Sequence, residues 1–174
     1  YINGITKLKK VLEDLKFTQY KIIIIENNGI RDTFLNDLGC EVFYTTNNFM
    51  HSRNKGVKEL SDVFDCIKAF NIKNKDFIVK MTGRYILNDN SEFMNVLKNK
   101  YNEILDCIIR FGSYLKPVDY KTDDCITGLI GMRCKYVKTI KIPFGQDCVE
   151  WEWAKVAKNI DNKHIYLVKS LGIS

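Results

Sequence analysis

The chain has 174 residues, of which 45% are hydrophobic and 28% charged, and its formal net charge is +6. At this length, roughly 70% of the surface of the unfolded chain can be buried on folding, so a core can form without disulfides or structural metal. The composition excludes collagen-like, low-complexity and disordered proteins. The basic residues are scattered along the chain, which favours a mildly basic surface over a nucleic-acid-binding tail.

The six cysteines are too widely spaced for a zinc ribbon or a redox pair, since no two are closer than nine residues. Cys66 and Cys107 lie among apolar neighbours, which is typical of reduced thiols in cytoplasmic proteins. The longest unbroken apolar run, 22–25, is too short to cross a bilayer. We therefore expect a cytoplasmic protein with free thiols and without a transmembrane segment.

Hydrophobic spacing separates predicted helices from predicted strands along the chain. The first half is predicted to contain a helix at 5–16, a strand at 21–25, a turn at 26–29, a short helix at 31–38 capped by Gly39, a strand at 41–45, a polar loop at 46–56 and a long helix at 57–67. The second half is predicted to contain a strand at 77–79, a helix at 93–97 that starts after 88–91, strands at 104–111 and 126–132, a helix at 149–160 and a strand at 164–168. This alternation predicts a single α/β domain over 1–174. Because parallel neighbours need a crossover, we expect a mostly parallel central sheet with helices on both faces.

The most informative stretch is 76–87, where a short apolar strand leads directly into Lys80, Thr82, Gly83 and Arg84. In an open α/β sheet, ligands bind beyond the carboxyl ends of the strands. Two cations and a glycine at that position suit a diphosphate, since Arg84 can bind it bidentately and Lys80 can act as a point charge. The alternative interpretation is a strand end followed by a turn.

Two further polar segments are candidates for binding a nucleotide. Glu26 and Asn27 follow a predicted buried strand, where a carboxylate and an amide could pair with the polar edge of a nucleobase. The alternative there is a turn that ends at Gly29. Asn54 and Lys55 precede the long helix, whose first N–H groups favour an anion, and the alternative is a solvated loop in which Asn54 caps the helix.

The order of the elements and the loops between them resemble the GT-A-type glycosyltransferases, which use nucleotide-sugar donors on a Rossmann-like domain. The segments that carry the resemblance are 1–3 as the end of a first strand, 21–28 as the second strand and base-binding turn, 54–56 as the start of the long helix, 128–133 as the acceptor side, and 144–153 as an acidic helix start. The resemblance implies transfer of a sugar from a nucleotide donor to a glycan or another hydroxyl acceptor. It also implies that the first strand begins upstream of Tyr1 and that Gly128 lies near the acceptor.

In inverting members of this family, the acidic helix start carries the base that takes the proton of the acceptor hydroxyl. The resemblance gives this role first to Glu150 and then to Glu152 and Asp147. Capping and the helix dipole are the alternative reasons for acidic residues there. Trp151 offers an indole for stacking against an acceptor sugar, whereas Trp153 falls on an apolar stripe. Retention of configuration is left open, because it depends on where the carboxylates lie.

The sequence departs from the family at its metal-binding motif. Members usually end the strand equivalent to 77–81 with an Asp-x-Asp motif that binds a divalent ion on the donor diphosphate, but this chain has no carboxylate between Lys80 and Arg84. Ammonium and guanidinium groups cannot ligate Mn²⁺ or Mg²⁺, which need oxygen ligands. We therefore expect either metal-independent transfer or a Mn²⁺ or Mg²⁺ site built from a non-standard carboxylate. Asp89 is the fallback ligand, although helix capping is its alternative role.

Other classes of protein remain as alternatives. A sugar-nucleotidyltransferase shares this type of sheet, but it usually has a glycine-rich loop after the first strand, where this chain has only Asn3-Gly4. The glycine patterns of dinucleotide oxidoreductases and P-loop NTPases are absent, and the two histidines indicate neither a metal site nor a nucleophile's partner. A non-catalytic nucleotide-binding or nucleic-acid-binding module is the non-enzymatic alternative. We expect no nucleic-acid partner, because the sequence has no ribonucleoprotein motif.

Overall fold

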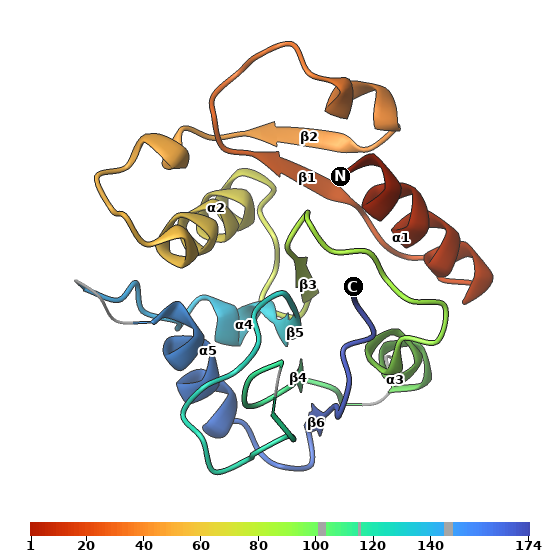
Figure 1. Ribbon diagram of the computed structural model, residues 1–174, viewed down its shortest axis with the longest axis vertical. Helices are drawn as coiled ribbons and strands as arrows, with labels where there is room; N and C mark the ends of the chain where they lie inside the picture. The colour runs from red at the N-terminus through yellow and green to blue at the C-terminus, as the bar shows by residue number, and fades with distance from the viewer. Residues whose placement is uncertain (101–103, 115, 145–147) are drawn as a thin grey trace.

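The computed structural model describes residues 1–100, 104–114, 116–144 and 148–174, and within them two β-sheets are flanked by helices (Figure 1). The helices are α1 (Ile2–Asp14), α2 (Lys55–Ala69), α3 (Glu92–Lys100), α4 (Cys134–Val137) and α5 (Val149–Lys158), with short 3₁₀ turns η1 (Phe34–Leu38) and η2 (Asn47–Phe49). The strands are β1 (Ile23–Glu26), β2 (Glu41–Tyr44), β3 (Phe77–Met81), β4 (Cys107–Ile109), β5 (Leu129–Arg133) and β6 (Ile165–Leu167). The predicted α/β class is confirmed.

The pairing of the strands is mixed. β1 and β2 form a parallel pair, and the second sheet has the order β3-β5-β4-β6. In that sheet β4 and β6 are parallel, but β5 is antiparallel to both β3 and β4. The prediction of one mostly parallel sheet is therefore wrong in this respect. The described part of the connection from β4 to β5 contains no helix, so the chain lacks the crossover that a parallel neighbour requires.

The second sheet has helices on both faces, as predicted. Successive side chains of a strand point to opposite faces, so Cys107 and Ile109 of β4 lie in one apolar cluster and Ile108 lies in another. The first cluster packs this face against α2, α4 and α5, and the second packs the opposite face against α1 and α3. β4 is completely buried between these two layers.

The first sheet is covered less completely. Residues Ile23, Ile24 and Ile25 of β1 are only half-buried, in contrast to β4. β1 is an edge of the first sheet and β3 is an edge of the second, and no strand pairing joins the two sheets within the described ranges. Figure 1 shows α2 beside both β1 and β3. Side chains of α2 contact both sheets, and α2 thereby holds the ends of their strands near each other.

Local sequence explains several element boundaries. Gly39 ends η1 in the left-handed conformation, with φ of 62°, and Asn54 caps α2 by accepting the N–H groups of Gly56 and Val57. The expectation that 1–3 end a strand is wrong, because α1 begins at Ile2. α4 was not predicted, since four residues are too few to show a helical period.

Two expectations about thiols and membranes can be compared with the structure. Cys66, Cys107, Cys125 and Cys134 are buried thiols. Their burial agrees with the predicted role of cysteines as core residues. In the part of the chain that the structure describes, no helix combines the length and apolar character needed to cross a lipid bilayer.

Candidate functional site

One side of α2 connects the segments that the sequence analysis selected. Gly56, Glu59 and Asp62 are three residues apart, so they follow one another along the same side of the helix. A side chain added at Gly56 would lie 3.1 Å from Cβ of Val149, at the start of α5. Glu59 contacts the end of β3, and Asp62 contacts the ends of β1 and β2. This side of α2 therefore gathers three strand ends and the start of a second helix.

The Lys80 side chain forms the centre of the cluster at the end of β3. Its ammonium donates to Glu59 Oε2 at 2.6 Å, to Thr82 Oγ1 at 2.9 Å and to the carbonyl oxygen of Thr127 at 2.7 Å. The side chain is only 12% exposed, whereas that of Glu59 is 39% exposed. An ammonium has three protons, so these three contacts use all of them. Lys80 can donate to a diphosphate only if it gives up one of these partners.

Glu150 joins the same cluster from α5. The hydroxyl of Thr127 donates to Glu150 Oε1 at 3.2 Å, while the carbonyl of Thr127 accepts from Lys80. The backbone N–H of Thr82 donates to the carbonyl of Gly128 at 2.9 Å. The structure thus brings Glu150, Lys80, Thr82 and Gly128 together from three separate segments, as a shared site requires.

Two tyrosines cover Gly128. A side chain on Gly128 would clash with the Tyr114 hydroxyl and would lie 2.7 Å from Tyr85 Cε2. The two rings are 6.0 Å apart between centroids, and their hydroxyls are hydrogen-bonded. The hydrogen bond from Tyr114 and the nearby guanidinium of Arg84 hold the pKa of Tyr85 below its ordinary value. These contacts fix the exposed Arg84 beside Tyr85, at the same strand end as Lys80.

The other residues of the acidic helix start differ in their surroundings. Glu152 Oε1 lies 3.9 Å from the ammonium of Lys155 on the same helix. Trp151 is 49% exposed and therefore accessible to a ligand, whereas Trp153 is buried in the core as its apolar spacing predicts. Asp147 lies outside the described residues. Of the predicted acids in the described ranges, Glu150 is the one that contacts the Lys80 cluster through Thr127.

Glu26 and Asn27 form a separate polar cluster at the end of β1. Burial alone would raise the pKa of Glu26, but hydrogen bonds from Asn28 and Arg31 outweigh it and hold the pKa below its ordinary value. Asn27 donates to Asp62 Oδ2 at 2.9 Å. Both predicted base-binding side chains are thus held in place by protein groups, so a nucleobase would meet a preformed turn.

Asp62 ties this turn to α2. Its buried carboxylate also accepts from Thr45 Oγ1 at 2.6 Å and from Asn47 Nδ2 at 2.8 Å. Hydrogen bonds of this kind satisfy a buried carboxylate without a cation. The ends of β1 and β2 are therefore fixed one helical turn along α2 from Glu59 and the end of β3.

Two positions bear on metal binding, Asp89 and the end of β3. Within 1–100, 104–114, 116–144 and 148–174, no group of three Asp, Glu, His or Cys side chains is arranged to hold a metal ion. Asp89, the fallback ligand, is exposed and paired with Lys7 of α1. At the end of β3, the ammonium of Lys80 already occupies the position between the oxygen atoms of Glu59, Thr82 and Thr127. A divalent ion does not fit there together with Lys80.

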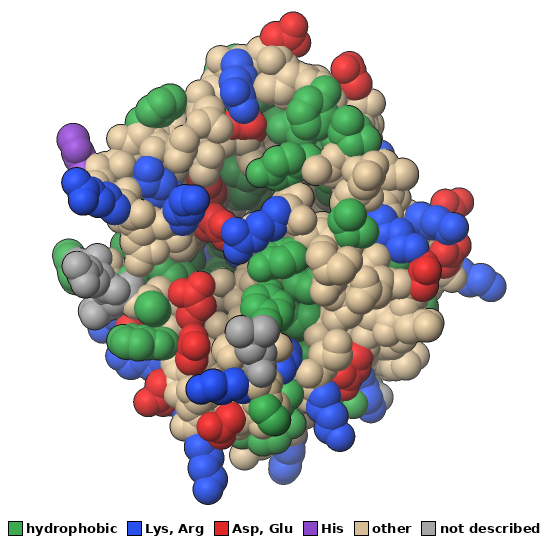
Figure 2. Space-filling view, viewed as in Figure 1, with side chains coloured by type: hydrophobic (Ala, Val, Ile, Leu, Met, Phe, Trp, Pro, Cys, Tyr) green, Lys and Arg blue, Asp and Glu red, His purple; other side chains and the backbone are tan. Residues whose placement is uncertain are grey.

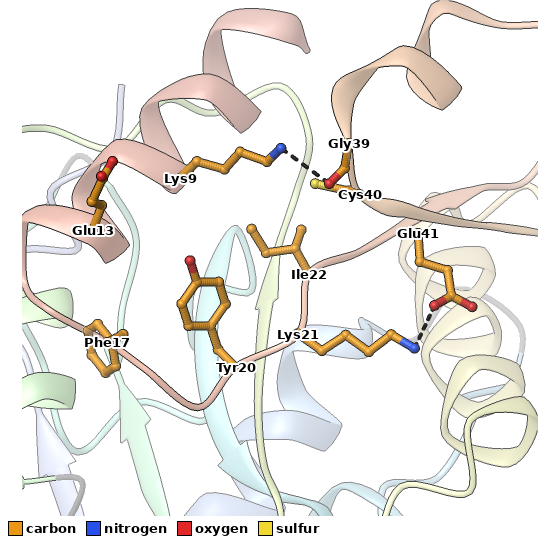
Figure 3. Close-up of a pocket in the computed structure, with 9 residues that line it drawn as sticks. All are labelled: Lys9, Glu13, Phe17, Tyr20, Lys21, Ile22, Gly39, Cys40 and Glu41. Atoms are coloured by element: carbon orange, nitrogen blue, oxygen red, sulfur yellow. Dashed lines mark hydrogen bonds and ion pairs between the residues drawn. The ribbon is translucent and has the colours of Figure 1, made fainter.

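Two views separate the candidate site from another hollow. Figure 2 shows basic and acidic side chains together beside a hollow between the two sheets, near the middle of the face. A second hollow, of about 680 Å³, lies at the opposite ends of β1 and β2, between α1 and η1 (Figure 3). Its cations are engaged, since Lys21 pairs with Glu41 at 2.6 Å and Lys9 bonds to the carbonyl oxygens of Leu38 and Gly39. We place the candidate site at the strand ends because the residues predicted for the base, the donor and the acceptor meet there.

Sequence reasoning missed five residues of this site. They are Glu59, Tyr85, Tyr114, Asp124 and Thr127. Burial raises the pKa of Asp124, and the negative charge of Glu150 adds to this rise. Glu59 lies three residues before the buried Asp62 on α2, and this polar spacing is the one sequence feature that could have indicated its role.

Comparison with known proteins adds no assignment. No family profile matches the chain, and no curated protein has a matching sequence. The function must therefore be argued from the residues and their contacts.

Proposed function

We propose that this protein transfers a sugar from a nucleoside-diphosphate sugar to a hydroxyl acceptor, on a GT-A-like fold. The observation that supports it best is the meeting of Glu150, Lys80, Thr82 and Gly128 at the ends of β3 and β5. The resemblance assigns these residues to the base, the donor and the acceptor. Such a meeting is required of a transferase and is not required of residues that only cap helices or end strands.

Helix positions support the placement of the donor diphosphate. α2 and α5 begin side by side, where Gly56 meets Val149. Helix N-termini carry partial positive charge and attract anions. Asn54 and Lys55 lie at the start of α2, and Arg84 follows the end of β3 as an exposed group that can bind a diphosphate bidentately. Lys80 is neutralised by Glu59, so its proposed role is to hold the strand end in place.

The proposed reaction is an inverting displacement. The carboxylate of Glu150 takes the proton of the acceptor hydroxyl as its oxygen attacks the anomeric carbon. The bond from that carbon to the diphosphate oxygen breaks, and its electron pair leaves on the nucleoside diphosphate. Arg84 stabilises the charge that develops on this leaving group. Trp151 and the tyrosines over Gly128 supply apolar surfaces against which an acceptor sugar can stack.

Ligand binding is tested first by thermal unfolding with nucleoside diphosphates and nucleotide sugars, in chelator and in Mn²⁺. A ligand that binds the folded state raises the melting temperature by mass action. The proposal expects a rise with at least one nucleoside diphosphate, and Arg84→Ala should reduce it. If none of these nucleotides raises the melting temperature, the proposed donor site is wrong.

Turnover is then measured as release of the nucleoside diphosphate from the sugar donor that binds. Glu150→Gln should lower the rate by about 10²–10⁴-fold while leaving donor affinity unchanged, since it removes a general base but keeps its shape. Glu41→Gln, which changes an exposed carboxylate at the far ends of the strands, is the matched control. Full activity in Glu150→Gln would refute the assignment of the base.

Two other outcomes would favour the alternative functions. Formation of a nucleotide sugar from a sugar phosphate and a nucleoside triphosphate would indicate a nucleotidyltransferase. Nucleotide binding without turnover on any sugar donor would indicate a non-catalytic binding module. In that case Glu150→Gln and Glu41→Gln would behave alike.

A further inference from the structure

The Lys80 ammonium is enclosed by oxygen atoms of three kinds. It is bound by a carboxylate oxygen of Glu59 at 2.6 Å, the hydroxyl oxygen of Thr82 at 2.9 Å and the carbonyl oxygen of Thr127 at 2.7 Å. Hard divalent cations select the same kinds of oxygen. We call this set of Glu59, Thr82 and Thr127 oxygens the oxygen cage. These oxygen atoms suit a cation. The cation that they bind is the ammonium of Lys80, which is part of the chain itself.

The charge around the cage also favours a cation. Glu59 contributes one negative charge directly, and Glu150 contributes a second through the Thr127 hydroxyl, which lies 3.2 Å from its carboxylate. Burial, and then the negative charge of Glu150, raise the pKa of Asp124. Without Lys80, the Glu59 carboxylate would lose its cation, and its negative charge together with that of Glu150 would attract a divalent ion.

We propose that the Lys80 ammonium is a built-in cation that fills an oxygen cage otherwise able to take a divalent ion, so that the site works without exchangeable metal. The filling of the cage follows from the contacts of Lys80. The second part, metal-independent catalysis, rests on the proposed transferase function. The two parts are tested by different measurements.

The cage is tested with two substitutions of Lys80 that differ in the space they leave. Lys80→Ala removes the charge and the chain, so it should open the cage to Mn²⁺. Lys80→Met removes the charge but keeps a chain of similar length in the cage, so it is the matched control. Lys80→Ala should gain about 4 °C in melting temperature when Mn²⁺ is at ten times its Kd, and the native protein and Lys80→Met should gain nothing.

A second substitution shows whether any gain arises in the cage. In the Lys80→Ala background, Glu59→Gln removes the carboxylate ligand and should abolish the stabilisation by Mn²⁺. A cooperatively folded Lys80→Ala variant that gains no stability from Mn²⁺ would overturn the proposal. A gain in the native protein that Glu59→Gln abolishes would also overturn it, because the cage would then take metal with Lys80 in place.

The native protein offers a measurement that does not depend on the folding of Lys80→Ala. Acylation of lysines by acetic anhydride, followed by mass spectrometry, reports how available each amine is. Lys80 should react much more slowly than the exposed Lys75, and Glu59→Gln should raise the rate at Lys80 alone. Equal rates at Lys80 and Lys75 in the native protein would overturn the proposal.

Metal-independent catalysis is tested separately, on the transfer reaction. The native protein should transfer sugar at the same rate in chelator and in Mn²⁺. Loss of transfer in chelator would overturn metal independence while leaving the cage result intact. Absence of transfer under both conditions would refute the proposed function instead, and the thermal and acylation results would still decide whether Lys80 fills the cage.

Discussion

Each end of β5 holds a charged group, the half-buried Lys80 at one end and the buried Asp106 at the other, and the two have opposite sign and different surroundings. Where β5 begins, the cation Lys80 is bound by oxygen atoms. Where β5 ends, the anion Asp106 is bound by nitrogen and hydroxyl donors. At the Lys80 end, exposed residues lie next to the residues of the cluster. Arg84 is two positions after Thr82, and Trp151 directly follows Glu150. An enclosed charge therefore marks a candidate site only when its partners reach a surface where a ligand can bind.

The Asp106 end is closed by structural contacts. Asp106 Oδ1 accepts from Arg133 Nε at 2.9 Å, and its Oδ2 lies within 3.2–3.6 Å of Tyr136, Lys135 and His164. Its side chain is 4% exposed. The Arg133 guanidinium also donates to the backbone carbonyls of Lys75 and Leu105, which joins β5 to the segments before β3 and β4. These contacts hold β5 to the neighbouring segments, and the Asp106 carboxylate itself is enclosed by them.

The largest effect is expected at the Asp106 end. Asp106→Asn leaves the Arg133 guanidinium without its carboxylate and should destabilise the protein by about 3 kcal/mol, measured by urea unfolding. The pKa of Asp106 is affected first by burial, which raises it, but the Arg133 and Lys135 contacts outweigh burial and lower it overall. A lowered folded pKa means that the stabilisation is present above the ordinary value of 3.8 and is lost as the pH falls through the folded pKa.

The cost of Asp106→Asn should accordingly be largest at neutral pH and shrink in acid. Asp14→Asn, at the exposed end of α1, is the control and should have little effect at either pH. If the cost of Asp106→Asn is the same at neutral and acid pH, the ion pairs do not account for it.

The second effect tests how tightly the Lys80 end is packed. Gly128→Ala should cost about 2 kcal/mol, because a methyl group would collide with the Tyr114 hydroxyl and with Tyr85. Tyr114→Phe removes the hydroxyl, so Gly128→Ala should cost less in that background. A double-mutant cycle followed by thermal unfolding measures this coupling. If the effects of the two substitutions are additive, the Tyr114 hydroxyl does not hinder a methyl group at Gly128.

The third effect distinguishes the two charged groups directly. Lys80→Met should destabilise the protein by about 1 kcal/mol, less than Asp106→Asn, because the Glu59 carboxylate that it leaves behind is 39% exposed and can be solvated. Urea unfolding of both variants under the same conditions tests the order. A larger loss for Lys80→Met would make the Lys80 end a structural clamp like the Asp106 end.

Local sequence was enough to select candidate residues, but it did not give the direction of the strands. Strand ends and helix starts are local features, so Lys80, Thr82 and Glu150 could be selected from their neighbours along the chain. Their meeting depends on the direction of β5, which places Thr127 and Gly128 beside the end of β3. If β5 were parallel to β3, Thr127 would lie beside the start of β3 and not beside its end. The predicted residues therefore meet through an antiparallel pairing that the sequence analysis did not expect.

The residues that sequence reasoning missed act through contacts that are distant in the chain. Glu59 reads as an ordinary charged residue of an amphipathic helix, and its contact with Lys80 spans 21 positions. Asp106 reads as an acid within the strand predicted at 104–111, and its contact with Arg133 spans 27 positions. Helical and strand periods report burial and direction, but they carry no information on which distant charge will lie opposite.

The smallest effect concerns two neighbouring acids near the Lys80 end. Burial and the charge of Glu150 raise the pKa of Asp124, so ionised Asp124 costs stability, and this cost appears as the pH rises through its ordinary and then its folded pKa. The hydrogen bond from Lys158 lowers the pKa of Asp123, which gives the opposite sign. At neutral pH, Asp124→Asn should slightly raise the melting temperature and Asp123→Asn should slightly lower it.

Both effects should fade in acid, where the carboxyl groups are protonated, and differential scanning calorimetry at two pH values measures them. Asp124→Asn combined with Glu150→Gln should gain less than the two changes separately, since each already removes the repulsion between the carboxylates. A fall in melting temperature with Asp124→Asn at neutral pH would mean that its hydrogen bond from the Cys125 N–H matters more than this repulsion. The beginning of β5 would then resemble its end, with a carboxylate that stabilises the fold.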